Sequence, residues 1–535
     1  MILLRFLAAV LLGIGVVAVD ASGAPDEAQS ALQLGSILYE TGFEGAEPLA
    51  GWIGPASIVP GRSGGQSIHV VRKPGEERGS TLFRPLDARA LRGHTLLCAA
   101  WVRASDVSEK PNTWNGIKVM LAIEAPSGSM WPQADLGTGS FDWRPVRFTV
   151  RVPDDAEKIN LHLGLELVTG EVWFDDVRVS VPQLPEGPPP PPARRRYRGH
   201  DLPRLRGAMI NPKTVTEEDL RTLGVVWKAN LVRWQLTYPA PSGRSISADD
   251  WDRWLEEELQ RLDAMLPLCR KYGLYIALDL HSPPGGRGTA GGYAGSDSGL
   301  FTDRAAQDQF VRAWEGMARR YKGNRTIWGF DLANEPVENA WDGTCDNWHA
   351  LVERTARAIR RIDPSRTLIV EPTLGGEPAG LAWFRPISAS NVVYSVHMYR
   401  PHEFTHQNVF APGPAVRYPG AIRGVMWDRA AIRKALEPAV QFQKAYNVQI
   451  YVGEFSAIRW APDDSAYRYL RDLIEVMEEL GWDWSYHAFR EWDGWSVEHG
   501  PEKGNHQKAT EPTSREKLLR EWFSKNRRPS FSGRP

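Results

Sequence analysis

Residues 251–281 read WDRWLEEELQRLDAMLPLCRKYGLYIALDLH, and this stretch holds one complete helix-and-strand unit. Apolar residues recur at helical spacing from Trp251 to Tyr272, and Gly273 follows where a helix commonly ends. The next residues, Tyr275–His281, form an apolar run of strand length. The stretch therefore predicts a helix, a glycine turn and a buried strand in immediate succession.

The same alternation recurs over residues 206–525. Strands are predicted at Arg206–Asn211, Asn230–Leu236, Tyr275–His281, Ile327–Asn334, Thr367–Glu371, Val392–Tyr399, Ile450–Phe455 and Trp482–Phe489. Further helices are predicted at Ala305–Tyr321, Trp348–Ile362, Arg429–Tyr446 and Tyr467–Leu480, the last ending at Gly481. Eight strands alternating with helices favour a (β/α)8 TIM barrel over an open doubly wound sheet. A dinucleotide-binding fold would need a glycine-rich turn after its first strand, and Asn211-Pro212-Lys213 is not one.

The first third of the chain has a different pattern. Residues 36–181 contain short alternating or apolar runs separated by Gly, Pro and Asp clusters, which predicts a jelly-roll-like β-sandwich. The runs are Ser67–Val71, Leu96–Val102, Ile117–Ile123, Val146–Val152, Ile159–Leu165 and Glu171–Val179. Residues 182–205 include Pro188–Pro192, a run that favours extended polyproline structure, so we interpret this segment as a semi-rigid linker between two domains. Residues 526–535 are expected to form a disordered tail.

The N-terminus has the features of a secretory signal peptide over residues 1–23. Arg5 supplies the positive charge, Leu7–Val19 the apolar segment, and Ala18, Ala21 and Gly23 offer alternative cleavage sites. An uncleaved membrane anchor is the alternative, because the apolar run nearly reaches the ~18 residues of a membrane span. We expect cleavage, and therefore a secreted extracellular or periplasmic protein that has no membrane attachment afterwards.

Composition excludes several classes of protein. Lys and Arg number 64 against 65 Asp and Glu, so no overall charge attracts nucleic acid or an anionic membrane. The three cysteines make neither a disulfide framework nor a zinc motif. The 22 tryptophans suit contact with the apolar faces of sugar rings, although Trp is also a core residue. We expect a monomer whose partner is a carbohydrate.

Polar side chains gather where the predicted barrel strands end, which is where barrel active sites lie. They are Asn211, Arg233, His281, Asn334, Glu335, His397, Tyr399, Glu454 and a charged, aromatic stretch over 489–495. Glu335 and Glu454 follow the fourth and seventh strands, on roughly opposite sides of an eight-stranded barrel. Two carboxyl groups facing each other are what glycoside hydrolysis requires, with ~5–5.5 Å between them for retention and ~6.5–9.5 Å for inversion.

These motifs resemble glycoside hydrolase family 5, the retaining cellulase and mannanase family. Asn334-Glu335-Pro336 is similar to the family's signature, and Arg233, His281, His397-Met398-Tyr399 and Gly453-Glu454-Phe455 also appear in the family's order along the chain. The resemblance extends from Arg206 to about Lys525 and implies a secreted retaining hydrolase of β-glucan, cellulose or mannan type that needs no cofactor. It leaves the particular β-glycan and endo or exo action open. A catalytically inactive carbohydrate-binding barrel and a transglycosylase that uses the same glutamates are the alternatives.

The resemblance also implies roles for the site residues. Glu335 would be the acid/base and Glu454 the nucleophile, with Arg233 and the Tyr399 hydroxyl stabilising the Glu454 anion. Asn334 would hydrogen-bond the sugar 2-hydroxyl, and His281 and His397 would bind sugar hydroxyls and orient the carboxyl groups.

One feature departs from the family, which normally places a Trp at the end of the eighth strand as a floor for the sugar. Here the strand reads Ser485-Tyr486-His487-Ala488-Phe489, and Phe489, Trp492 or Trp495 could form that floor. We favour Trp492. A long loop over 401–426 is expected to line the cleft.

The N-terminal sandwich resembles the carbohydrate-binding domains that accompany polysaccharide hydrolases. Residues 40–44 at its start and 173–177 at its end carry this likeness, which implies a structural calcium ion near those carboxylates. Trp114 and Trp131 are the candidate sugar platforms.

Overall fold

The computed structural model describes Leu32 and residues 35–76, 80–112, 114–126, 128–134, 136–182, 204–238, 247–285, 299–338, 344–409 and 412–531. The predicted signal peptide (1–23) and nearly all of the predicted linker (182–205) lie outside these residues. No helix within the described ranges is long and apolar enough to cross a membrane.

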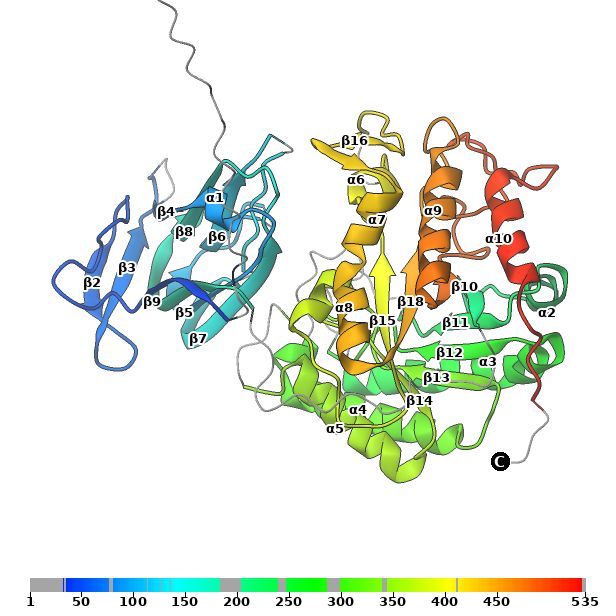
Figure 1. Cartoon of the computed structure of the whole chain (residues 1–535). Helices are drawn as coiled ribbons and strands as arrows, with labels where there is room; N and C mark the ends of the chain where they lie inside the picture. The colour runs from blue at the N-terminus through cyan, green and yellow to red at the C-terminus, as the bar shows by residue number, and fades with distance from the viewer. Residues whose placement is uncertain are drawn as a thin grey trace, which may run out of the picture. The chain divides into compact units, whose positions relative to one another are not determined.

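The N-terminal part consists of two antiparallel sheets, which confirms the predicted β-sandwich (Figure 1). The larger sheet has the order β2-β3-β9-β5-β7, and β1 also pairs with β9. Its strands are β1 (Ile37–Thr41), β2 (Ser57–Pro60), β3 (Gln66–Arg72), β5 (Thr95–Val107), β7 (Gly139–Arg151) and β9 (Gly170–Ser180). The smaller sheet has the order β4-β8-β6, with β4 (Ser80–Leu86), β8 (Lys158–Glu166) and β6 (Gly116–Glu124). A single helical turn, α1 (Ala88–Leu91), follows β4.

The sandwich core comes from the alternation of side chains along each strand. In β5 every second residue from Leu96 to Ala104 is buried, and β9 buries Val172 and Phe174 in the same sheet. The smaller sheet buries Leu82 and Leu163. In this way the apolar faces of the two sheets pack against each other.

The C-terminal part is a closed barrel of eight parallel strands with helices around it, as predicted (Figure 1). The strands are β10 (Arg206–Ile210), β11 (Leu231–Gln235), β12 (Tyr275–Asp279), β13 (Ile327–Asp331), β14 (Thr367–Val370), β15 (Val392–Met398), β18 (Gln449–Phe455) and β19 (Asp483–Tyr486), and β19 pairs with β10 to close the barrel. The α-helices are α2 (Glu217–Arg221), α3 (Ala248–Tyr272), α4 (Arg304–Arg320), α5 (Trp348–Ile362), α6 (His402–Thr405), α7 (Arg429–Ala435), α8 (Glu437–Tyr446), α9 (Ser465–Leu480) and α10 (Ser514–Ser524). A π-helical turn, η1 (Thr222–Val226), and two 3-10 helices, η3 (Gly299–Phe301) and η4 (Pro378–Trp383), complete the set.

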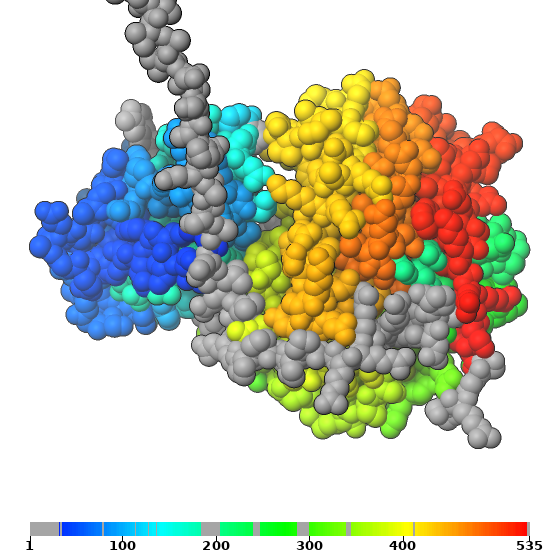
Figure 2. All heavy atoms as spheres, viewed as in Figure 1, coloured from blue at the N-terminus to red at the C-terminus, as the bar shows by residue number. Residues whose placement is uncertain are grey.

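Side chains of the outer helices close over the strands behind them on the face seen in Figure 2, where α7 and α8 are yellow to orange and α9 is orange. The largest apolar cluster lies between the strands and these helices and includes Trp234, Trp314 and Trp484, all fully buried. A second cluster includes Leu231, Ala277, Ile369, Val393 and Tyr451.

Two predicted segments differ from the structure. The single helix predicted over 429–446 is two helices, because Pro438 at the start of α8 cannot donate a helical hydrogen bond. The predicted loop over 401–426 contains α6 and a hairpin of β16 (Gly420–Ile422) and β17 (Val425–Trp427).

The described part of the predicted tail is held against the barrel. Asn526 donates hydrogen bonds to the carbonyl oxygens of Arg206 (3.1 Å) and Lys228 (3.0 Å). The Phe531 ring lies 5.1 Å from the ring of Tyr275. The expectation of disorder is therefore wrong for residues 526–531, and residues 532–535 lie outside the description.

Candidate active site

The inward-facing side chains of the barrel strands change character along each strand. Leu231, Ala277, Ile369 and Val393 are apolar and share one buried cluster. Two residues further on, the same face carries Arg233, Asp279 and Glu371, because side chains two residues apart share a face, and on β15 His397 lies four residues beyond Val393. The carboxyl ends of the strands therefore carry ionisable groups above an apolar floor.

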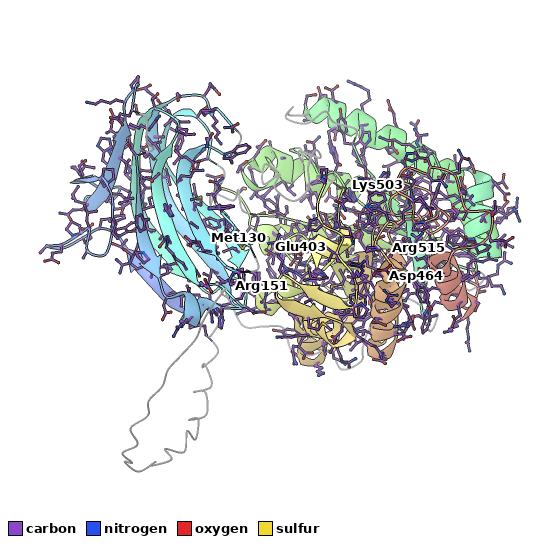
Figure 3. The ribbon with its side chains drawn as sticks, turned by 90° about the horizontal axis from the view of Figure 1, so that it is seen from above. Met130, Arg151, Glu403, Asp464, Lys503 and Arg515 are labelled. Atoms are coloured by element: carbon purple, nitrogen blue, oxygen red, sulfur yellow. The ribbon has the colours of Figure 1, made fainter. Side chains whose placement is uncertain are left out.

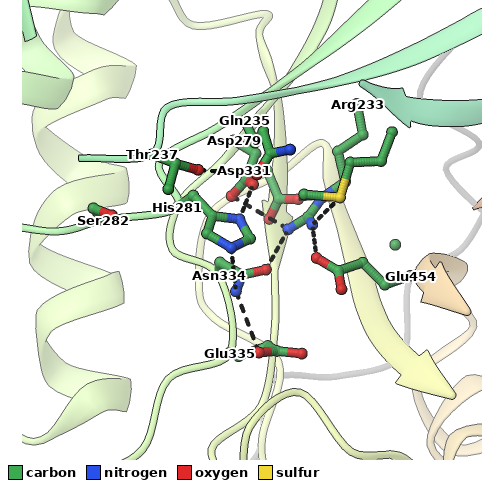
Figure 4. A network of polar contacts seen from close by, with 12 residues as sticks. Arg233, Gln235, Thr237, Asp279, His281, Ser282, Asp331, Asn334, Glu335 and Glu454 are labelled. Carbon is green, nitrogen blue, oxygen red and sulfur yellow. Dashed lines mark hydrogen bonds and ion pairs between the residues drawn. The ribbon is translucent and has the colours of Figure 1, made fainter. Parts of the chain in front are cut away.

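Arg233 on β11 is the centre of this group and is fully buried (Figure 4). Its Nε donates to Asp331 (2.9 Å) and one terminal nitrogen donates to Glu454 (2.5 Å). The other terminal nitrogen lies 3.2 Å from Asp279 and 3.2 Å from Glu371. Burial alone would lower the pKa of Arg233, but these four carboxyl groups raise it well above the ordinary value.

Glu454 reaches Arg233 because β18 contains an irregularity. In the pairing of β15 with β18, Val396 is opposite Val452 but His397 is opposite Glu454, so Gly453 is the extra residue of a bulge. A Cβ atom on Gly453 would lie 2.7 Å from Ser395 Oγ and 2.9 Å from His397 Nε2. Only glycine leaves room for His397 beside this strand.

The Glu454 carboxylate is surrounded by hydrogen-bond donors and positive charge. Its Oε2 accepts from the Tyr399 hydroxyl (2.9 Å), while Oε1 accepts from Arg233. Burial would raise the pKa of Glu454, but His397, His487 and Arg233 hold it well below the ordinary value. Glu454 is therefore an ionised carboxylate at neutral pH.

Glu335 is fixed from both its backbone and its side chain. It has a left-handed backbone conformation (φ 49°), which is sparsely populated by residues with a Cβ atom and costs about 1–3 kcal/mol. Its amide donates to Oε2 of Glu371 (2.8 Å), and its side-chain Oε1 lies 2.7 Å from Nδ1 of His397. These contacts hold Glu335 in the strained conformation.

The carboxyl groups of Glu335 and Glu454 lie close together, with His397 between them. One ligand-type atom from each of these three side chains lies within 4.8 Å of the other two. Carboxylate oxygens that approach each other this closely fit the ~5–5.5 Å separation of retaining glycosidases. Arg233 and the His397 ring already supply positive charge there, so we assign no metal ion to the three side chains.

Asn334 and His281 extend the network on the other side of Arg233 (Figure 4). The Asn334 side-chain oxygen accepts from Arg233 (3.0 Å), and its amide nitrogen lies 3.3 Å from Nε2 of His281. Nδ1 of His281 lies 2.9 Å from Asp279. The structure thus brings together Arg233, His281, Asn334, Glu335, His397, Tyr399 and Glu454, all of which are expected from sequence.

Two residues of the site were missed by the sequence prediction. Glu371 lies at the end of β14 and contacts Arg233, the Glu335 amide and His397, whose Nε2 is 3.0 Å away. Its place as the last residue of a predicted strand was a signal for it. His487 follows β19, and its Nδ1 lies 3.2 Å from Glu454.

The comparisons with known proteins agree with this geometry. A family model described as Cellulase (glycosyl hydrolase family 5) matches residues 195–491, more than half of the chain. The chain belongs to glycosyl hydrolase family 5. An endoglucanase C of Acetivibrio thermocellus is 30% identical over 303 residues, which cover 51% of this chain and 84% of that protein. Cellodextrinase A of Ruminococcus flavefaciens is 25% identical over 232 residues, 42% of this chain and 66% of that protein. This family 5 protein is a glycosidase.

The three aromatic residues considered for the sugar floor of this family 5 glycosidase differ in their exposure and contacts. Phe489 is buried in the barrel core against Trp227, with ring centroids 5.0 Å apart. Trp492 is 38% exposed, and its ring meets those of Trp460 and Trp495. Trp495 lies 5.9 Å from the rings of both Tyr399 and His487. Trp495 thus packs beside Tyr399 but is only 7% exposed, so Trp492 as the floor for the sugar stays a prediction.

The loops around these tryptophans are tied together. Lys503, labelled in Figure 3, donates to the carbonyl oxygen of Asn408 (2.6 Å) and lies 5.0 Å from the ring of Trp460. Trp460 in turn donates to the carbonyl oxygen of Gln407 (2.9 Å). The loop after β19 is thereby fixed to residues of the 401–426 loop, which stands beside Tyr399.

The acidic residues expected to hold calcium in the sandwich have protein partners. Asp175 accepts from the Arg62 amide (2.9 Å), Asp176 pairs with the Arg62 guanidinium (2.7 Å), and Glu44 accepts from the Gln66 amide (2.7 Å). Calcium at this end of the sandwich stays a prediction.

Proposed function

We propose that this protein is a secreted retaining β-glucan hydrolase in which Glu335 is the acid/base and Glu454 is the nucleophile. The observation that carries the proposal is the close approach of two buried carboxyl groups, one of which is held as an anion. Glu454 is held ionised by His397, His487 and Arg233, and the Glu335 carboxyl group lies 2.7 Å from Nδ1 of His397 and 3.3 Å from the Asn334 side-chain nitrogen.

In the first step, Oε2 or Oε1 of Glu454 attacks the anomeric carbon while Glu335 gives its proton to the leaving glycosidic oxygen. A glycosyl ester of Glu454 forms, and the leaving group departs as an alcohol. Arg233 and Tyr399 keep the attacking carboxylate in place through their hydrogen bonds. The Asn334 side chain, which is itself oriented by Arg233, is available to bind the sugar 2-hydroxyl.

In the second step, Glu335 takes a proton from water, and the water oxygen attacks the anomeric carbon and releases Glu454. Two inversions give net retention. His397 contacts Glu335 through Nδ1 and Glu371 through Nε2, so it can keep the acid/base oriented in both steps. A sugar hydroxyl in place of water would make the same chemistry a transglycosylation.

The relatives support the substrate class. Proteins similar to this chain are named endoglucanase and cellodextrinase, and we infer a β-linked glucan as the substrate here. We further propose secretion, which the signal-peptide features of residues 1–23 support.

The test is substitution of the two glutamates. Glu454→Ala is expected to abolish turnover of soluble cello-oligosaccharides, and Glu335→Ala to lower it by about 100-fold or more, the usual contribution of a general acid. Azide should rescue Glu454→Ala and give a glycosyl azide of inverted configuration. Glu479→Ala is the control, because Glu479 is an exposed residue of α9 that pairs with Arg429 and Arg433. Near-native activity of Glu454→Ala would refute its role.

Product analysis tests the rest of the proposal. Proton NMR of the wild-type reaction should show the β-anomer as the first product, whereas a first-formed α-anomer would contradict retention. A panel of cellulose, mixed-linkage β-glucan and mannan identifies the polymer, and longer products than the substrate would identify transglycosylation.

A further inference from the structure

His487 is a partly buried ionisable group at the barrel mouth, with a side chain that is 16% exposed, and it directly follows β19. Its Nδ1 lies 2.5 Å from the Tyr399 hydroxyl oxygen and 3.2 Å from Oε2 of Glu454. Its Nε2 lies 3.4 Å from Oε2 of Glu491, a residue of the same loop. His487 therefore stands between two carboxyl groups, one on each ring nitrogen.

This position determines the charge of the ring. A neutral imidazole carries a proton on only one nitrogen, whereas the imidazolium ion donates from both. Burial alone would lower the pKa of His487, but Glu454 and Glu491 raise it to about 10. Glu491 remains ionised, because His487 and a hydrogen bond from Gln235 hold its pKa below the ordinary value although burial opposes them.

We propose that His487 and Glu491 form a positioning pair, in which a fixed imidazolium ion keeps Glu454 ionised and orients the Tyr399 hydroxyl toward it. The inference rests on the proposed role of Glu454 as the nucleophile. The Tyr399 hydroxyl donates to Glu454, and the same oxygen can accept a hydrogen bond from Nδ1 of His487. The ring thus supports Oε2 of Glu454 both directly and through Tyr399.

A further cation is useful because the charges of Arg233 and His397 are both shared with other carboxyl groups, those of Glu335 and Glu371 in the case of His397. Arg233 contacts Asp279, Asp331 and Glu371 as well as Glu454. His487 has only Glu454 and Glu491 as carboxylate partners at ion-pair distance among the described residues. When Glu454 becomes a neutral glycosyl ester, Glu491 still neutralises the buried imidazolium, so the intermediate is not left with an uncompensated charge.

Other titratable and aromatic side chains also face His487 and Glu454. Those that face His487 from neighbouring elements are Tyr399, His406 and Trp495, and those that face Glu454 are Arg233, His397, Tyr399 and His487. The pKa of His406 is lowered to about 3 by burial and by the nearby His402 and His487, so His406 is neutral in the working range and supplies no competing charge.

The first experiment is the pH profile of kcat/KM for His487→Asn in the full chain. Asn keeps a polar side chain but removes the cation, so the pKa of Glu454 should rise and the acid limb should move to higher pH by about 1–3 units. Glu511→Gln, an exposed carboxylate of the loop after β19, is the control and should leave the acid limb unchanged. Circular dichroism and thermal unfolding establish that each variant is folded.

The second experiment reads the charge of the ring without activity. In protein with ¹⁵N-labelled histidine, the NMR resonance of His487 is identified as the one that is missing in His487→Asn. In the wild type at pH 8, this resonance should have the chemical shift of an imidazolium ion. In Glu491→Gln it should titrate at lower pH, because one of the two carboxylate partners is gone. This measurement also covers the case in which His487→Asn does not fold, since Glu491→Gln then identifies the resonance by its shift.

An unchanged acid limb in folded His487→Asn, or a neutral His487 ring at pH 8 in the wild type, would overturn the inference. Neither result would contradict the proposed function, which is refuted by a different result, namely activity that remains in Glu454→Ala.

Discussion

Gly453 illustrates how one residue determines the geometry of the site. Its lack of a side chain lets β18 bulge toward His397, and the bulge aligns Glu454 with that histidine. Gly453→Ala should displace His397 and reduce kcat, and such overpacking typically costs about 1–3 kcal/mol of stability. Activity assays and chemical unfolding measure both effects. Gly504→Ala is the matched control, because a Cβ atom there meets nothing within 4 Å. Equal behaviour of the two variants would contradict this explanation.

The environment of Glu454 also predicts the acid side of the wild-type pH profile. Catalysis needs the ionised carboxylate, and positive neighbours hold its pKa well below 4.5. The ionised form therefore persists as the pH falls, and kcat/KM should decline on the acid side only below pH 4.5. The measurement is initial rate against pH, with samples returned to pH 6 to separate titration from denaturation. A reversible decline centred above 4.5 would show that the positive neighbours do not act as described.

The C-terminal end of helix α9 is determined by a glycine. Helix α9 stops at Gly481, which has a left-handed conformation (φ 78°) and donates its amide to the last turn of the helix. Gly481→Ala should lower the free energy of unfolding by about 1 kcal/mol, because a Cβ atom is disfavoured in that conformation.

The matched control at this scale is Gly316, an exposed residue inside α4 with nothing within 4 Å of an added Cβ atom. Gly316→Ala should stabilise the protein by up to about 1 kcal/mol, since alanine has the higher helix propensity. Denaturant unfolding of the two variants, with opposite signs expected, tests the assignment. Stabilisation by Gly481→Ala would contradict it.

At the scale of the whole molecule, the described catalytic groups all come from barrel strands or the loops that follow them. The sandwich contributes exposed aromatic side chains: Trp114 and Trp131 are each 61% exposed. Trp114 lines an open surface depression of about 610 Å³ together with Lys110, Asn112 and Thr138. Exposed indole rings beside polar groups suit sugar binding, so we propose that the sandwich attaches the enzyme to polymer.

Removing residues up to 192 should therefore lower activity on insoluble polymer and leave activity on short soluble substrates unchanged. Attachment raises the local concentration of barrel at a polymer surface, whereas a soluble oligosaccharide reaches the cleft by diffusion. Rates on both substrates, compared between the truncated and full-length proteins, provide the test. Equal loss on both would mean that the sandwich supports the barrel structurally, and no loss on either would remove the binding role. Trp114→Ala in the full chain should reproduce a selective loss.

The sequence by itself determined the sandwich, the eight barrel strands and most of the site, because each depends on local patterns. Side chains such as Asn334 and Glu454 lie at or next to the ends of predicted strands, and parallel strands bring their carboxyl ends to one mouth. Pro438 shows that apolar periodicity alone does not predict where a helix is interrupted. The helical period continues through Pro438, although this residue cannot donate a helical hydrogen bond.

Only the tertiary structure decided which side chains meet across the barrel. Glu371 and His487 were visible at the ends of their strands, but their partners lie on other strands and have no sequence period that connects them. The positions of Trp495 beside Tyr399 and of Trp492 against Trp495 depended on how one loop folds back toward Tyr399. The physical reason is that a strand pattern specifies the face on which a side chain lies, whereas charge and contact depend on distances between segments far apart in the chain.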